Sequence, residues 1–218
     1  MIDFIHIPKN AGTSIQEICA PNLEGSFITY HGHGTDPGTL DGEQLVILRD
    51  PKDRFCSAVR YSLAFMRDNE DGDPDKYHDF ETRDLVDPNS WIEVLVDINH
   101  KQYDLVSREI RNVNHKVGNM HLDDKWTYTP QHIWLNRCCC PRVALFHELS
   151  DDIRYIFTSM NCHINYDIPH ENAVFKPRNF ELSDIAHEYL DKKYHEDIMI
   201  FNKYKTMTKE ARLGHHCG

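Results

Sequence analysis

The sequence predicts an α/β fold, with a parallel sheet flanked by helices in a single domain. Three observations favour this class. Strand-like and helix-like segments alternate over about the first 65 residues. The third strand is a continuous apolar run, which is typical of a strand buried in a parallel sheet. A turn with a lysine, a glycine and two hydroxyl side chains joins the first strand to the first helix, and 218 residues suit one domain over 1–218.

The first five elements follow from apolar patterning and from helix start signals. A short buried strand is predicted at 2–7, and a helix with hydroxyls in its first turn at 12–20. The segment 25–34 predicts a second strand that runs into a glycine-flanked turn. The apolar run at 43–50 predicts the third strand, and a helix follows at 52–66.

The remainder is predicted to be mostly helical. The segment 67–88 is acidic and poorly periodic, which fits either a solvated loop or a lid over an acceptor site. Beyond it we expect helices at 89–98, 101–112, 149–161 and 183–204, and one late strand at 142–149.

Charge and composition narrow the function classes. The formal net charge of -11 argues against a general nucleic-acid binder, which needs a broad basic face. No apolar run approaches the roughly 20 residues that span a bilayer, and no secretory signal is visible. We therefore expect no membrane insertion, in a cytoplasmic protein or in a lumenal catalytic domain cut from a membrane-anchored parent.

The seven cysteines have no metal-ligand spacing, and the fifteen histidines form no metal motif, so we expect no metal site. Mostly reduced thiols are the first interpretation. One or two bridges within the set Cys138–Cys140, Cys162 and Cys217 are the alternative.

The turn Pro8–Ser14 predicts an anion site, because a helix N-terminus offers free N–H groups and partial positive charge. It is P-loop-like but departs from GxxxxGK[ST]: Lys9 precedes the glycine, and no Walker-type aspartate closes the third strand. Many donors with few metal ligands suit transfer of a group less charged than a γ-phosphate, such as a sulfuryl group. The alternative is a tight turn with a purely structural role.

A second motif lies in "VILRDPKDRFCSAVRY" (46–61). Arg49 ends the third strand, while Arg54 and Ser57 share one face of the next helix. Arginine with serine suits a phosphate monoester, so two anion sites would lie at the carboxyl ends of neighbouring strands. The alternative is a surface ion pair between Asp50 and Arg54.

Together, "HIPKNAGTSI" and "LRDPKDRFCSAVRY" resemble the 5′-phosphosulfate and 3′-phosphate motifs of sulfotransferases that use 3′-phosphoadenosine 5′-phosphosulfate (PAPS). "TYHGHG" (29–34) resembles the YHGH segment of heparan sulfate 2-O-sulfotransferases, whose histidine deprotonates a sugar hydroxyl. Further resemblance to carbohydrate sulfotransferases lies at 129–135, 145–149 and 189–204. The stretch 67–128 matches nothing and is interpreted as an elaborated insert that would face the acceptor. The sequence is shorter than those of Golgi members and contains no segment that resembles their membrane anchor, so we do not expect a polymer acceptor from the resemblance alone.

The resemblance implies a PAPS-dependent enzyme without a metal. Lys9 would neutralise charge on the leaving phosphate, and Arg49 with Ser57 would bind the 3′-phosphate. His33 would be the general base with His31 in support, and Glu148 is a lesser candidate. Backbone N–H groups would hold the 5′-phosphate, and a later loop would add two contacts; these residues are Asn10, Ala11, Gly12, Thr13, Ser14, Lys176 and Arg178.

Alternation along an extended segment would turn His31 and His33 to one face, towards the same pocket. The expected acceptor is a hydroxyl of a saccharide or glycan. Two other functions stay open: a metal-dependent small-molecule kinase, and a non-catalytic nucleotide-binding or interaction protein.

Overall fold

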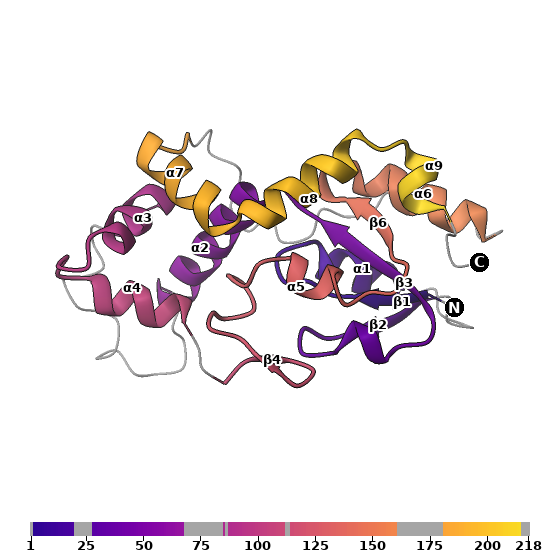
Figure 1. Ribbon diagram of the computed structural model, residues 1–218, viewed down its shortest axis with the longest axis horizontal. Coiled ribbons are helices and arrows are strands. Elements are labelled where there is room, and N and C mark those ends of the chain that lie inside the picture. The colour runs from indigo at the N-terminus through magenta and orange to yellow at the C-terminus, as the bar shows by residue number, and fades with distance from the viewer. Residues whose placement is uncertain are drawn as a thin grey trace.

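A four-stranded parallel sheet lies at the centre of the computed structural model, which describes residues 2–19, 28–67, 85, 87–111, 114–160 and 181–214 (Figure 1). Its strands are β1 (Ile2–Ile5), β2 (Ile28–His31), β3 (Glu43–Leu48) and β6 (Arg142–Leu145), in the order β2-β1-β3-β6. Phe4 pairs with Tyr30 on one side and with Leu45 on the other. The predicted α/β class with a parallel sheet flanked by helices is confirmed.

The helices are α1 (Gly12–Cys19), α2 (Pro51–Arg67), α3 (Pro88–Val96), α4 (Tyr103–Ile110), α5 (His132–Leu135), α6 (Leu149–Ser159), α7 (Asp184–Lys193), α8 (His195–Thr206) and α9 (Lys209–Leu213). Short 3-10 turns lie at Pro37–Thr39 and Phe146–Glu148, and β4 (Lys116–Val117) pairs antiparallel with β5 (Met120–His121). None of the helices in these described ranges is long and apolar enough to cross a membrane.

The sheet is apolar on both faces, as the continuous runs in its strands predict. Phe4 and Leu45 point to the face covered by α1, α6 and α9, whereas Ile5 and Val46 point to the face covered by α5 and α8. A separate apolar cluster joins α2, α3, α4 and α7, which Figure 1 shows grouped beyond the sheet. The helix α2 begins just after the carboxyl end of β3 and runs into this cluster, so it links the two parts.

Several expected boundaries shift. The helix expected at 183–204 divides into α7 and α8 at Tyr194, whose hydroxyl donates to the carbonyl oxygen of Tyr128 over 2.8 Å. The strand expected at 142–149 ends at Leu145 and continues as a 3-10 turn. The elements α5, β4, β5 and α9 were not predicted, because each is too short to show a period.

Two sequence predictions fall partly outside the described residues. Of the acidic stretch 67–88, the structure places only its two ends. The thiols of Cys56, Cys138 and Cys139 are free, so no bridge joins Cys138 to Cys140; Cys162 and Cys217 lie outside the described residues.

Candidate functional site

The turn between β1 and α1 (residues 6–11, the Lys9 turn) has an unusual backbone. Lys9 and Ala11 both have positive φ, at 67° and 60°, a conformation that is uncommon for non-glycine residues and concentrates at functional sites. The first helical hydrogen bond runs from the amide of Ile15 to the carbonyl of Ala11 over 3.1 Å. The amides of the first turn therefore have no acceptor within α1, which is the arrangement that favours an anion.

Not every predicted donor of this turn points outward. The amide of Asn10 bonds the carbonyl of Ile7 over 3.3 Å, and the Asn10 side chain is buried. The backbone N–H of Asn10 is therefore not available for the expected contact with a phosphate in this conformation. Thr13 is exposed at the start of α1, whereas Ser14 is buried.

Gly12 is required by close packing at the start of α1. A Cβ atom at this position would lie 1.8 Å from Nε2 of His6, well inside contact distance. The His6 ring is hydrogen-bonded to the Tyr30 hydroxyl, and burial lowers its pKa to about 3. A neutral histidine ring thus lies directly behind the turn.

Lys9 lies at the rim of this turn. Its ammonium is 4.3 Å from the centre of the Tyr61 ring. Burial first, and then the guanidinium groups of Arg49 and Arg54, lower the pKa of Lys9 to about 8. Three positive charges are therefore concentrated here, so a bound anion would be favoured and would restore the ordinary pKa of Lys9.

The Arg49 guanidinium is partly engaged. Its Nε donates to Asp53 over 2.6 Å, one terminal nitrogen donates to the Lys9 carbonyl over 3.0 Å, and its plane lies 4.2 Å from the Phe146 ring centre. A guanidinium has five N–H donors, so three remain for a ligand. Ser57 is half-buried on α2.

Arg54 does not have either of the roles that its sequence position suggested. Its guanidinium is buried and donates to the carbonyls of Pro8, Thr129 and Trp126 over 2.9, 2.8 and 3.0 Å. It therefore neither pairs with Asp50 at the surface nor offers a free fork to a phosphate. Its role is to fix the Lys9 turn to the segment before α5.

A buried polar network supports the turn from the other side. The side-chain amide of Asn10 donates through Nδ2 to the carbonyl of Ile47 over 2.7 Å and to the side-chain oxygen of Gln131 over 2.6 Å. Asp197 on α8 in turn accepts from the backbone of Gln131 over 2.6 Å and lies 2.8 Å from Nδ1 of His132. Sequence reasoning missed this network, since its members come from three distant segments; their only signal was the family-like stretches at 129–135 and 189–204.

The two predicted catalytic histidines diverge. His33 lies in the turn after β2, with Nδ1 3.0 Å from the carbonyl oxygen of His6, and its ring centre lies 4.2 Å from that of the His6 ring, with the two planes tilted by 53°. His31 instead points to Asp3, with Nε2 2.8 Å from the carboxylate. Because His31 ends the strand and His33 lies beyond it, strand alternation does not apply, and the expectation that both face one pocket is wrong.

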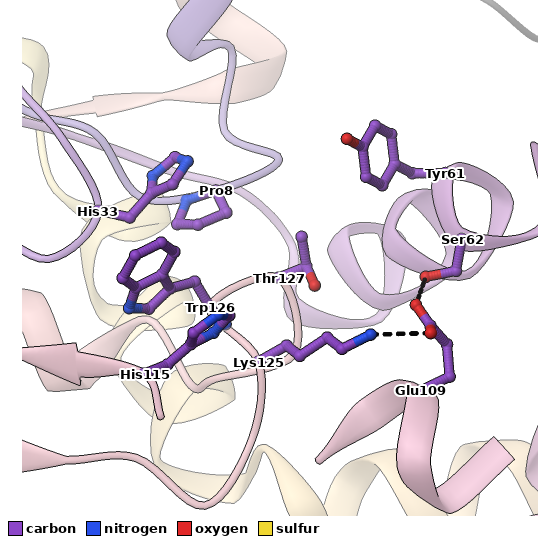
Figure 2. Close-up of a pocket in the computed structure, with 9 residues that line it drawn as sticks. All are labelled: Pro8, His33, Tyr61, Ser62, Glu109, His115, Lys125, Trp126 and Thr127. Atoms are coloured by element: carbon purple, nitrogen blue, oxygen red, sulfur yellow. Dashed lines mark hydrogen bonds and ion pairs between the residues drawn. The ribbon is translucent and has the colours of Figure 1, made fainter. Parts of the chain in front are cut away.

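A cavity of about 290 Å³ lies beside His33 (Figure 2). It is lined by Pro8, His33, Tyr61, Ser62, Glu109, His115, Lys125, Trp126 and Thr127. Pro8 belongs to the Lys9 turn, and Tyr61 carries the Lys9 ammonium on its ring. The cavity therefore brings together the turn, the histidine, Glu109 and side chains from 115–127, all of which but the first two lie in the unmatched part of the chain. No sequence signal pointed to Glu109, Lys125 or Trp126, because only folding brings them to α2.

Three other residues were predicted to contribute to this site: Lys176, Arg178 and Glu148. Lys176 and Arg178 lie outside the described residues. Glu148 bonds Arg212, which supports a structural role rather than a catalytic one. Within the described ranges, no group of three His, Cys, Asp or Glu side chains could hold a metal ion.

Comparison with known proteins adds no assignment: no family model, no curated protein and no solved structure matches this chain.

Proposed function

We propose that this chain is a PAPS-dependent sulfotransferase that sulfates an acceptor hydroxyl of a carbohydrate. One observation carries the proposal: a cation-rich turn at a helix N-terminus and a histidine with a fixed tautomer border the same cavity. PAPS is proposed as the cofactor because of the motif resemblance. The donor-rich, positively charged turn fits its phosphate groups, with Lys9 and the first amides of α1 at the 5′ side and Arg49 with Ser57 at the 3′ side.

The tautomer of His33 follows from its hydrogen bond. A carbonyl oxygen can only accept, so Nδ1 carries the hydrogen that bonds the His6 carbonyl. Nε2 of the neutral ring therefore has a free lone pair for the proton of an acceptor hydroxyl. Burial lowers the pKa of His33, which keeps this basic form dominant at neutral pH.

PAPS, when bound, supplies an activated sulfuryl group. The chain's part is to hold it and to place charge near the reacting groups. Lys9 provides that charge at the turn, and the Arg54 and Asn10 bonds keep the turn rigid.

The decisive experiment combines binding with transfer. Calorimetry without Mg²⁺ should show binding of 3′,5′-diphosphoadenosine, and labelled PAPS should pass its sulfate to a hydroxyl acceptor. Nucleotide binding that requires Mg²⁺ and transfer of phosphate from ATP would indicate the kinase instead. Tight diphosphoadenosine binding without transfer to any acceptor would indicate the non-catalytic nucleotide-binding protein.

A further inference from the structure

The cavity beside His33 has a polar end whose charges are already matched. Lys125 lies 2.8 Å from one carboxylate oxygen of Glu109, and the Ser62 hydroxyl donates to the other over 2.9 Å (Figure 2). Ser62 also bonds the Tyr128 hydroxyl over 2.8 Å. The single formal positive charge in the lining is thus neutralised by the single formal negative one. These groups can still bond hydroxyls, since each keeps unused donor or acceptor capacity.

The opposite end is aromatic and uncharged. Trp126 stacks on His115 with 4.2 Å between ring centres, and it lies 5.5 Å from the His33 ring. The indole N–H donates to the Lys116 carbonyl over 3.0 Å, which fixes the ring. The two imidazoles have lowered pKa values, chiefly through burial, and so are neutral at neutral pH.

We propose, resting on the sulfotransferase function above, that this cavity binds the acceptor as an uncharged, single sugar ring and disfavours an anionic saccharide. A volume of about 290 Å³ is at the lower end of the range for ligand sites, so it suits one ring rather than an oligomer. An aromatic wall facing a cluster of hydrogen-bonding groups suits a polyol, which has both apolar and hydroxyl surfaces.

Charge is the property that would distinguish neutral from anionic saccharides in this cavity. A carboxylate in this cavity would lose its hydration and would meet Lys125 already bonded to Glu109. The chain's net charge of -11 also repels an anionic polymer at longer range. An uncharged ring has neither cost. The cations beside the cavity do not offset this preference once nucleotide is bound, because Lys9 and Arg49 then pair with its phosphates.

The test compares methyl glycosides that differ at one carbon. Saturation-transfer NMR with the full chain in the presence of 3′,5′-diphosphoadenosine should show binding of the methyl glycosides of glucose, galactose or mannose, and much weaker binding of methyl glucuronide and galacturonide. Trp126→Ala should abolish the neutral-sugar signal. Glu109→Gln keeps an oxygen for the Ser62 hydroxyl but frees Lys125, so it should shift the preference towards the uronides by about tenfold or more. Glu188→Gln on α7 makes the same charge change at an exposed position away from the cavity and should leave the preference unchanged.

The outcomes separate this inference from the enzyme assignment. No binding of any neutral glycoside, a signal that survives Trp126→Ala, or uronide binding as strong as that of the neutral sugars would overturn it. Sulfate transfer to an anionic saccharide in that case would leave the sulfotransferase function standing. Neutral-sugar binding at the cavity without any binding of 3′,5′-diphosphoadenosine would remove the sulfotransferase function and leave the charge preference of the cavity.

Discussion

His33 donates its Nδ1 hydrogen to the backbone carbonyl of His6 over 3.0 Å, so the turn after β2 is bonded to the residue that follows β1. A backbone acceptor cannot change its protonation state. The free lone pair of His33 is therefore fixed at Nε2 by the fold rather than by a titrating neighbour.

His33→Ala should reduce sulfate transfer by roughly 10²- to 10⁴-fold while leaving 3′,5′-diphosphoadenosine affinity nearly unchanged. Because the base acts when deprotonated, kcat/KM of the native protein should rise with pH. Burial lowers the pKa of His33, so this limb should lie below the ordinary histidine value of about 6.5. A pH-rate profile checks both points, with the exposed His121→Ala as control; full activity of the His33 variant would exclude the assignment.

Lys9 should take up a proton when nucleotide binds. Its pKa of about 8 in the free protein should rise as phosphate approaches, so binding at about pH 8.5 should consume protons. Calorimetry in buffers of different ionisation enthalpy measures this uptake. Lys9→Met should remove it, whereas Lys192→Met on α7 should not; the same proton uptake in the Lys9 variant would show that another group titrates.

Arg49→Ala should weaken 3′,5′-diphosphoadenosine binding by about 1.5–3 kcal/mol, because it removes charge-assisted bonds to the 3′-phosphate. Affinity for the 5′-monophosphate should change much less. Titration of both nucleotides against the variant, with the exposed Arg108→Ala as control, tests this difference. Equal losses for the two nucleotides would mean that Arg49 only shapes the Lys9 turn through its bond to the Lys9 carbonyl.

The pair of buried Asp197 and half-buried His132 should give a pH-dependent stability. The hydrogen bond to Asp197 raises the pKa of His132 above its unfolded value. Its contribution is therefore fully present below about pH 6.5 and is lost as pH rises through the folded pKa. Denaturant unfolding over this range should show the loss. Asp197→Asn should cost about 3 kcal/mol or more at low pH and abolish the slope, while the exposed Asp151→Asn should do neither.

Gly12→Ala should destabilise the protein by about 1–3 kcal/mol, because its Cβ would overlap the His6 ring. His6→Ala opens that space, so in the double variant the change at Gly12 should cost little. A double-mutant cycle of thermal unfolding measures the coupling. Additive losses would show that the two residues do not constrain each other.

The strands and long helices could be predicted because each has its own signal. The apolar runs at β1 and β3, and the helices α2 and α6, are decided by local burial patterns. The Lys9 turn was also visible, since a lysine, a glycine and hydroxyls between a strand and a helix have few other uses. Arg54 is a residue whose role could not be predicted from local spacing. Its spacing to Ser57 fitted a phosphate site, yet its guanidinium donates hydrogen bonds to three backbone carbonyls from other segments.

The sequence by itself determined the α/β class and the position of the turn between β1 and α1, and it made His33 a candidate. Only the tertiary structure decided that His31 turns to Asp3, that Asn10 is bound to Gln131, and that Glu109, Lys125 and Trp126 complete the cavity. The physical reason is the sequence separation over which each kind of interaction acts. Periodicity and helix-start preferences act between residues a few positions apart, whereas these hydrogen bonds and ion pairs form between segments that meet only after the sheet and the α2 cluster have packed.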